Sequence, residues 1–142
     1  MERWHEFQVR VYYEDTDAQG VVYFANYLKF MERARTEWLR VLGVEQDWLA
    51  KEHGLCFALT ATGARFHRPA RFNDQLVVRT RIVGIGRARI ELEQAVYRLV
   101  DNELLCSADC VAACIDVESF RPRRIPADLF DAQRAIVLQE QG

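Results

Sequence analysis

A carboxylate-rich loop that runs directly into a helical pattern is the stretch of this sequence best suited to chemistry. Glu14, Asp15 and Asp17 lie close together, and the longest helical pattern of the chain begins at Phe24. A positioned carboxylate can act as a general base or as a nucleophile. The first N–H groups of a helix have no acceptor within the helix, and they favour a negative or developing negative oxygen. The loop and the helix start are therefore the first candidate site.

The residue that caps this helix decides whether those N–H groups are available. Val22 and Tyr23 lack the short polar side chains that cap helices. A helix that starts there leaves its first N–H groups free for a ligand, whereas Asn26 as the cap would remove this vacancy. The sequence leaves both arrangements open.

The elements that must position the loop follow from the spacing of apolar residues. Helical spacing continues to Leu42, Gly43 suits the position just beyond the helix, and shorter helices are predicted over 47–53 and 127–138. Strands are predicted over 7–13, 55–66, 75–85, 87–99 and 103–117, with short turn-rich links between the last three that indicate antiparallel pairing. This order predicts an α+β domain, an antiparallel β-sheet wrapped around a long central α-helix. Pairing with a second copy is one way to protect the edge of such a sheet.

Composition narrows the class of protein. A length of 142 residues suits a single domain over 1–142. The formal net charge of −2 argues against the broad basic surface that duplex nucleic acid requires. No apolar run approaches the ~20 residues of a membrane span, and the first ten residues carry charges where a signal peptide is apolar. We therefore expect a cytoplasmic protein with no membrane span and no nucleic-acid partner.

Cysteine spacing raises the question of a metal site. Cys106, Cys110 and Cys114 are four residues apart and would line one face of a helix. The turn signal Asp101-Asn102 before them favours a strand instead. On a strand, residues four apart are separated by ~13 Å, too far for three thiolates to share one ion. We interpret these cysteines as small buried thiols and expect no metal and no cofactor.

Three blocks of sequence resemble a known family. The block VYYEDTDAQGVVYFANYLKFMERARTEWL is similar to the opening of the hotdog-fold acyl-CoA thioesterases of the 4-hydroxybenzoyl-CoA thioesterase type, above all the branch encoded with the bacterial Tol-Pal envelope system. RFHRPARFNDQLVVRT and CIDVESFRPRRIP extend the resemblance over nearly the whole chain. It implies a thioester hydrolase acting on acyl-CoA or on acyl carrier protein, active without a cofactor as a homodimer or homotetramer.

The resemblance also implies roles for individual residues. The catalytic carboxylate of the family falls on Asp17, and the backbone N–H of Phe24 is expected to face the thioester carbonyl in a site at a dimer interface. Asp15 is expected to shape the loop, and Glu14 to face solvent. Further substrate-binding residues are expected from their position in the chain and not from the resemblance. They are Tyr23 and Tyr27 near the helix start for the acyl group, and Arg87, Arg123 and Arg124 for the coenzyme A phosphates, which arginine can bind in a bidentate manner.

Several alternatives stand beside this interpretation. Asp17 can instead stabilise an Asx turn, whereas an apolar setting of Val21, Val22 and Tyr27 would strengthen its carboxylate as a base. Many members of the Tol-Pal branch have histidine where this chain has Phe24, so no imidazole role carries over, although the amide remains. A hotdog 3-hydroxyacyl dehydratase would need a His–carboxylate pair, and no histidine occurs from 6 to 52. A non-catalytic carrier-protein or envelope-complex adaptor is the other rival.

Overall fold

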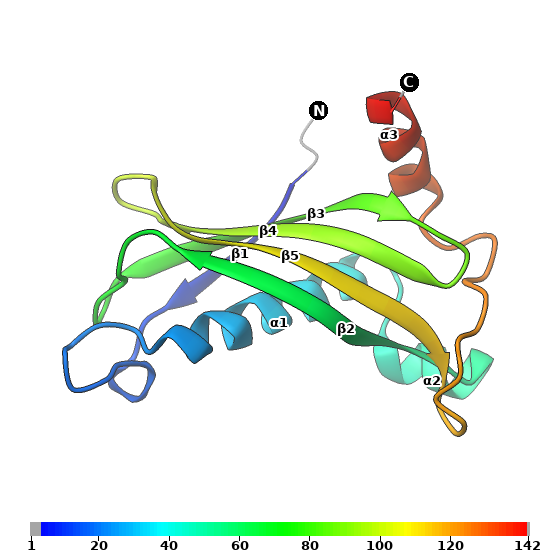
Figure 1. Cartoon of the computed structure of the whole chain (residues 1–142), viewed down its shortest axis with the longest axis horizontal. Helices are drawn as coiled ribbons and strands as arrows, with labels where there is room; N and C mark the ends of the chain where they lie inside the picture. Colours follow the sequence, from blue (N-terminus) through cyan, green and yellow to red (C-terminus); the bar gives the residue numbers. More distant parts are fainter. Residues whose placement is uncertain (1–3, 142) are drawn as a thin grey trace.

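A five-stranded antiparallel sheet curves around one long helix (Figure 1). The computed structural model describes the backbone of residues 4–141 and the side chains of residues 4–139. The strands are β1 (His5–Arg10), β2 (Leu55–Phe66), β3 (Gln75–Ile85), β4 (Arg89–Arg98) and β5 (Glu103–Asp116). The helices are α1 (Phe24–Val41), α2 (Gln46–His53) and α3 (Asp131–Gln141). The predicted α+β arrangement is confirmed.

The strand order is β1-β3-β4-β5-β2, and every neighbouring pair is antiparallel. The hairpins from β3 to β5 form the centre, as their short turn-rich links predict. The chain from β2 to β3 crosses the sheet, so β2 becomes one edge and β1 the other. The edge strand β2 is twelve residues long and β1 only six.

The core lies between α1 and one face of the sheet, in two parts that follow the two halves of the helix. Phe30, Met31 and Ala34 are at most 1 % exposed and pack against the ends of β3, β4 and β5 nearest the helix start. Trp38 and Leu39 pack in a second cluster with residues from the other ends of those strands and from the segment that leads into α3. Because both clusters bury apolar surface, the helix is held along its whole length.

The predicted boundaries were right for β2 and β3 and wrong by a few residues elsewhere. The first strand ends at Arg10, because Tyr13–Asp15 form a short 3-10 turn. The last helix begins at Asp131 rather than at Ala127, since the chain turns at 127–130 before it. Left-handed glycines follow two helices: Gly43, as expected, with φ +79°, and Gly54 with φ +66°.

The cysteine-bearing segment is a strand, as predicted. Cys106, Cys110 and Cys114 are all buried with free thiols. Burial in apolar surroundings raises the pKa of the Cys106 thiol to about 11. Cys106 is therefore a packing group and not a thiolate at neutral pH.

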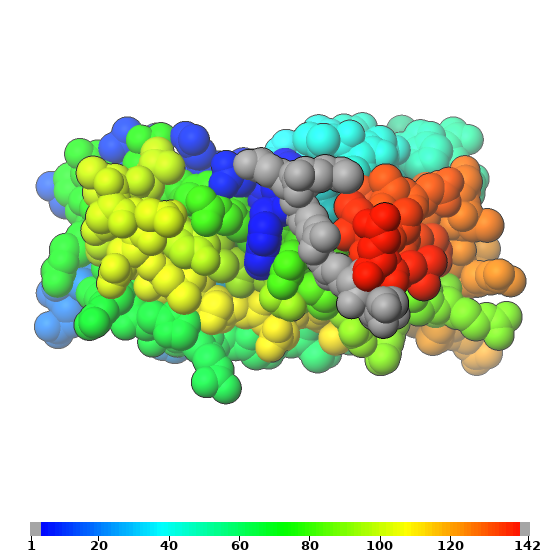
Figure 2. All heavy atoms as spheres, turned by 90° about the horizontal axis from the view of Figure 1, so that it is seen from above, coloured from blue at the N-terminus to red at the C-terminus, as the bar shows by residue number. Residues whose placement is uncertain are grey.

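The molecule is elongated, with different elements at its two ends (Figure 1). The loop before α1 lies at one end, and the β3–β4 turn and α3 lie toward the other. Figure 2 shows α3 (red) beside the segment that precedes it (orange). Among residues 4–141, the helices all fall short of the length and apolarity that crossing a bilayer requires.

Candidate active site

Asp15 organises the loop that leads into α1. One of its side-chain oxygens accepts the N–H of Tyr12 at 2.8 Å. Its backbone carbonyl accepts the N–H of Tyr23 at 3.0 Å and the side-chain amide of Asn26 at 2.8 Å. Asp15 thus ties the loop to the first turn of the helix, which confirms the role predicted for it.

Asp17 begins a tight turn on the same loop. Its carbonyl accepts the N–H of Gly20 at 3.0 Å, and its own N–H donates to the carbonyl of Val21 at 2.9 Å. Gly20 has φ +77°, a left-handed conformation that glycine adopts without strain. The Oδ1 atom of Asp17 accepts the N–H of Gln19 at 2.8 Å, as in an Asx turn. Its Oδ2 atom has no hydrogen-bond partner among the residues described.

The apolar setting expected for Asp17 is absent from the single chain. Asp17 is exposed and Val21 only half-buried, while Val22 is buried in the core. Glu14 faces solvent as predicted. The loop forms a bulge on the end of the molecule, so a carboxylate there meets water unless another molecule covers it. Desolvation of Asp17 would therefore have to come from the substrate or from a second copy.

The structure also decides which residue precedes the helix. Tyr23 is the N-cap, without a side-chain cap, and Phe24 is the first helical residue. Asn26 bonds back to Asp15 instead of capping the helix. Within residues 4–141 the N–H of Phe24 has no hydrogen-bond acceptor. Of the two arrangements that the sequence allowed, the structure has the one in which the first N–H of the helix is available to a ligand.

Aromatic rings gather at the start of α1. The rings of Tyr23 and Phe24 lie 4.7 Å apart, and that of Phe66 lies 5.9 Å from Phe24. All three are between 46 % and 56 % exposed, so they form an apolar patch on the surface. Phe66 was not predicted as a site residue. It is the last residue of β2, and only the folding of β2 onto β5 brings it to the helix start.

Tyr27 lies in the core rather than in a substrate pocket. Its ring is 3 % exposed, and its hydroxyl accepts the backbone N–H of Ala70 at 3.0 Å. Burial raises the pKa of this phenol. The expectation that Tyr27 lines the acyl site is therefore corrected: it anchors α1 to the segment before β3.

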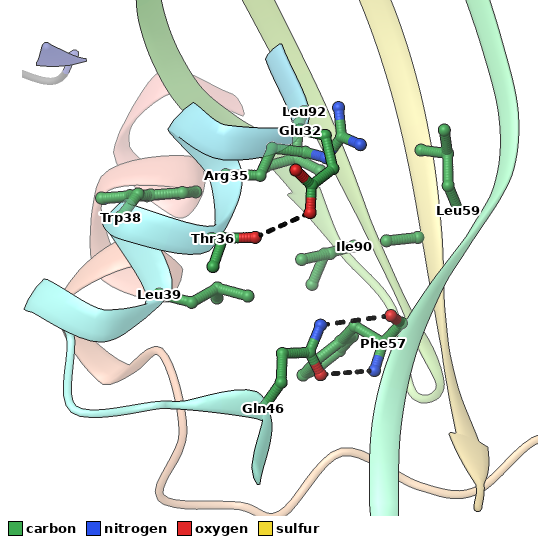
Figure 3. A pocket seen from close by; sticks show the side chains of 11 residues that line it. Glu32, Arg35, Thr36, Trp38, Leu39, Gln46, Phe57, Leu59, Ile90 and Leu92 are labelled. Atoms are coloured by element: carbon green, nitrogen blue, oxygen red, sulfur yellow. Dashed lines mark hydrogen bonds between the residues drawn. The ribbon is translucent and has the colours of Figure 1, made fainter. Parts of the chain in front are cut away.

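A cavity of about 200 Å³ lies between the C-terminal half of α1 and the sheet (Figure 3). Its floor is mainly apolar, and its walls come from α1, α2, β2, β4 and β5. Gln46 closes one side, because its side-chain amide makes two hydrogen bonds to the backbone of Phe57, at 3.2 and 3.3 Å. Glu32, which accepts the Thr36 hydroxyl at 3.2 Å, and Arg35 supply charge.

This cavity is separate from the predicted catalytic residues of the same chain. Glu32, at its near edge, is eight residues from Phe24 and therefore ~12 Å further along the helix. The cavity has the apolar lining that an acyl group requires. Neither Asp17 nor Phe24 is among its lining residues.

The three predicted phosphate-binding arginines divide into two kinds. Arg123 forms an ion pair with Asp116, with Nη1 2.7 Å from Oδ2. Arg87 and Arg124 line a hollow of about 370 Å³, together with Arg134 of α3, which sequence reasoning missed. Only the predicted C-terminal helix hinted at Arg134, as nothing in the sequence places that helix beside the β3–β4 turn. The structure therefore groups two of the predicted arginines and separates the third.

Comparison with known proteins identifies the family. The model of the Thioesterase-like superfamily matches residues 11–133. The chain belongs to this superfamily. The acyl-CoA thioesterase YbgC of Haemophilus influenzae is 43 % identical over 124 residues, which cover 87 % of this chain and 89 % of that protein.

Solved thioesterase structures share the fold. A probable thioesterase from Bartonella henselae, 39 % identical, has a TM-score of 0.80 and covers 87 % of this chain and 99 % of its own. A variant of 4-hydroxybenzoyl-CoA thioesterase, complexed with 4-hydroxybenzoyl-CoA, has a TM-score of 0.84 at 22 % identity, covering 93 % and 99 % of the two chains. The sheet and central helix of this thioesterase-family chain are thus those of the hotdog fold, as predicted.

The three histidines of this superfamily member contact residues other than Asp15 and Asp17. The ring of His5 stacks on that of Trp38, with centroids 6.5 Å apart. His53 ends α2, and His67 Nε2 lies 2.9 Å from the hydroxyl of Ser107. None therefore forms the His–carboxylate pair that a dehydratase site would need.

Proposed function

We propose that this protein hydrolyses acyl-CoA thioesters, with Asp17 as the catalytic carboxylate and the Phe24 amide as the oxyanion donor. The named YbgC relative is an acyl-CoA thioesterase. One observation carries the proposal. Among the residues described, the N–H of Phe24 has no acceptor and the Oδ2 atom of Asp17 has no partner, and both groups belong to the same loop-and-helix unit. Acyl transfer needs these two groups, a base or nucleophile and a donor for the oxyanion.

Hydrolysis of the thioester in this site consumes only water. Asp17 takes a proton from water while the water oxygen bonds to the carbonyl carbon, and the negative oxygen that results accepts the Phe24 N–H. The C–S bond then breaks, and the thiolate of coenzyme A receives the proton. Asp17 can instead attack the carbonyl carbon directly, giving a mixed anhydride that water then hydrolyses. This route also needs the Asp17 carboxylate and the Phe24 N–H. A positioned base contributes ~10²–10⁴ in rate and an oxyanion donor ~10²–10³.

A second copy of the chain completes this site in our proposal. The edge strand β2 spans twelve residues with one charged side chain, Arg65, and exposes Leu59 and Phe66. A long edge with so little charge readily pairs with another strand. A two-fold axis that pairs β2 with its copy reverses one chain against the other. The Asp17 end of one protomer then lies beside the arginine-lined end of its partner.

This arrangement suits the length of the substrate. Strand β3 runs from the Asp17 end to the arginine hollow of the same chain. Its 11 residues span ~33 Å. The pantetheine arm has about as many backbone bonds as four or five extended residues, roughly 15 Å. One coenzyme A molecule is therefore too short to reach from Asp17 to the arginine hollow of the same chain. It can reach from Asp17 of one chain to the arginine hollow of the other. The partner's cavity between α1 and the sheet then takes the acyl group.

The decisive experiment is a hydrolysis screen that follows thiol release from acyl-CoA and acyl-carrier-protein thioesters of several chain lengths, with ultracentrifugation of the same sample. We expect hydrolysis by a dimer or a dimer of dimers. Binding of acyl carrier protein without any hydrolysis would instead support the adaptor function, which the Asx-turn geometry of Asp17 favours. Association with the Tol-Pal system, a cytoplasmic location and independence of cofactors stay predictions.

A further inference from the structure

Asn26, in the first turn of α1, is one of three buried polar side chains among the residues described, with Thr80 and Gln94. Gln94 donates to the Thr80 hydroxyl and to the carbonyl of Met31, each at 3.0 Å. Asn26 instead donates from Nδ2 to the carbonyl of Asp15 in the loop, at 2.8 Å. Burial of an amide is unfavourable unless it is hydrogen-bonded, and asparagine has a lower helix propensity than leucine. The bond to the loop is therefore what this side chain contributes at a position that an apolar residue would otherwise suit.

The loop that Asn26 contacts is a narrow hairpin. The N–H of Asp17 donates to the carbonyl of Val21 at 2.9 Å, and the N–H of Tyr23 donates to the carbonyl of Asp15 at 3.0 Å. An isolated antiparallel bridge lies between these two bonds. Phe24 follows Tyr23 directly, so the hairpin and its attachment to the helix determine where the Asp17 carboxylate lies relative to the Phe24 N–H.

The carbonyl of Asp15 joins the hairpin to the helix through two donors, the N–H of Tyr23 and the side-chain amide of Asn26. Any residue except proline would supply the first donor, because it belongs to the backbone. The second is the one side-chain hydrogen bond between α1 and the loop within the part of the chain that the structure describes. It leaves the N–H of Phe24 unused, so Asn26 can hold the loop without occupying the proposed oxyanion donor.

We propose that Asn26 is a positioning residue for thioester hydrolysis, and that its amide holds the hairpin so that the Asp17 carboxylate and the Phe24 N–H meet the same carbonyl group. The proposal rests on the proposed function. The side chain of Asn26 is 8 % exposed and bonded to the loop, so it acts through those two groups and not on the substrate. A misplacement of about 1 Å in a reacting group can cost ~100-fold in rate.

The helix does not depend on Asn26 for its place in the core. The hydroxyl of Tyr27 accepts the N–H of Ala70 at 3.0 Å, and Phe30 is 1 % exposed in the cluster beneath the helix. The carbonyl of Asp15 also keeps its bond from the backbone when the Asn26 amide is removed. Loss of this amide should therefore loosen the hairpin while helix and sheet stay in place.

Steady-state kinetics with Asn26→Ala test the proposal. We expect kcat for an acyl-CoA to fall about ten- to 100-fold and KM to stay within about twofold, because the reacting groups are misplaced and the substrate contacts remain. Thr80→Val is the matched control, since it removes a hydroxyl that is also buried and hydrogen-bonded, but within the sheet and the core. Its kcat should stay within about twofold of wild type. An unchanged kcat in Asn26→Ala, or equal losses in both variants, would overturn the proposal.

Asn26→Asp keeps the shape of the side chain and makes hydrogen-bond donation depend on pH. A protonated carboxyl can donate to the carbonyl of Asp15, whereas an ionised one can only accept and is repelled by that oxygen. Turnover relative to wild type should therefore rise as pH falls through the pKa of the introduced carboxyl, which NMR titration locates. The ratio corrects for the titration of Glu14, Asp15 and Asp17, which both proteins contain. A ratio that stays constant across that pKa would contradict the proposal.

Amide hydrogen exchange separates this proposal from the hydrolase function, because it requires no turnover. In Asn26→Ala, the N–H groups of Asp17 and Tyr23, which close the hairpin, should exchange at least about tenfold faster than in wild type, and those in the second half of α1 should not. If the wild-type protein hydrolyses no thioester but this difference holds, the hydrolase function fails while the hold of Asn26 on the hairpin stands. If thioesters are hydrolysed and exchange is unaltered, Asn26 does not position the hairpin and the proposal is overturned.

Discussion

Each end of the molecule carries two charged residues close together in sequence, acidic at one end and basic at the other. At one end Asp15 is engaged by three hydrogen bonds to its side chain and carbonyl, while Asp17 keeps one oxygen unbonded. At the other end Arg123 is held by Asp116, while Arg124 faces a hollow. In each pair of near neighbours, one charge maintains the local fold and the other stays available for a ligand.

This comparison explains why charge alone is a poor guide to function. A carboxylate or guanidinium whose bonding capacity is used within the chain stabilises a loop, and its loss is felt in folding. One whose capacity is unused can bind substrate, and its loss is felt in kinetics. The two kinds stand one or two residues apart, so substitutions of neighbours separate them.

The largest difference in kcat and Tm is expected between variants of the two aspartates. Asp17→Asn should lower kcat at least about 100-fold, because the base or nucleophile is lost, and should leave Tm nearly unchanged. Asp15→Ala should lower Tm by several degrees, since the backbone N–H of Tyr12 loses its acceptor. Steady-state kinetics and thermal unfolding of both variants check this. Normal turnover by Asp17→Asn would refute its catalytic assignment.

A smaller difference is expected between the two adjacent arginines. Arg124→Gln should raise KM for acyl-CoA about five- to tenfold at low ionic strength, and less in high salt, where the interaction is screened. Arg123→Gln should raise it much less, because that charge is already neutralised by Asp116. Measuring KM at two salt concentrations tests this. Equal rises would mean that Arg123 leaves Asp116 to bind substrate.

The cavity between the C-terminal half of α1 and the sheet gives a third test. Thr36→Phe should fill part of it and lower kcat/KM for long acyl chains several-fold relative to acetyl-CoA, because bulky side chains exclude ligand from an apolar pocket. Thr36→Val removes the hydroxyl without filling the space and is the matched control. A chain-length profile that both variants leave unchanged would place the acyl group elsewhere.

The smallest effect concerns acid stability at the arginine end. The N–H groups of Ser119 and Glu118, together with Arg123, lower the pKa of Asp116. A lowered pKa stabilises the fold above the ordinary carboxyl pKa of about 4, and this contribution is lost as pH falls through the folded value. Wild-type Tm should therefore fall more steeply than that of Asp116→Asn below pH 4. Parallel curves would show that the negative charge of Asp116 does not support this end of the fold.

Local pattern was enough to predict much of the architecture. The bounds of β2 and β3 and the glycine that follows α1 were predicted from periodicity and backbone preference, which act over a few residues. The resemblance of the loop to a thioesterase family was also visible in the sequence, and the family is confirmed.

Tertiary contacts decided the rest, because they join residues that are far apart in the chain. Tyr27 was expected at the substrate but bonds to Ala70 in the core, and Phe66 reaches the helix start only because β2 pairs with β5. Arg134 and Arg87 line one hollow only because Val137 of α3 and the segment before this helix pack in the same core cluster as the second half of α1. The sequence by itself determined which elements form and which loop carries the acid. Only the folded chain determined which charges stay unpaired, since pairing depends on distances that local pattern does not encode.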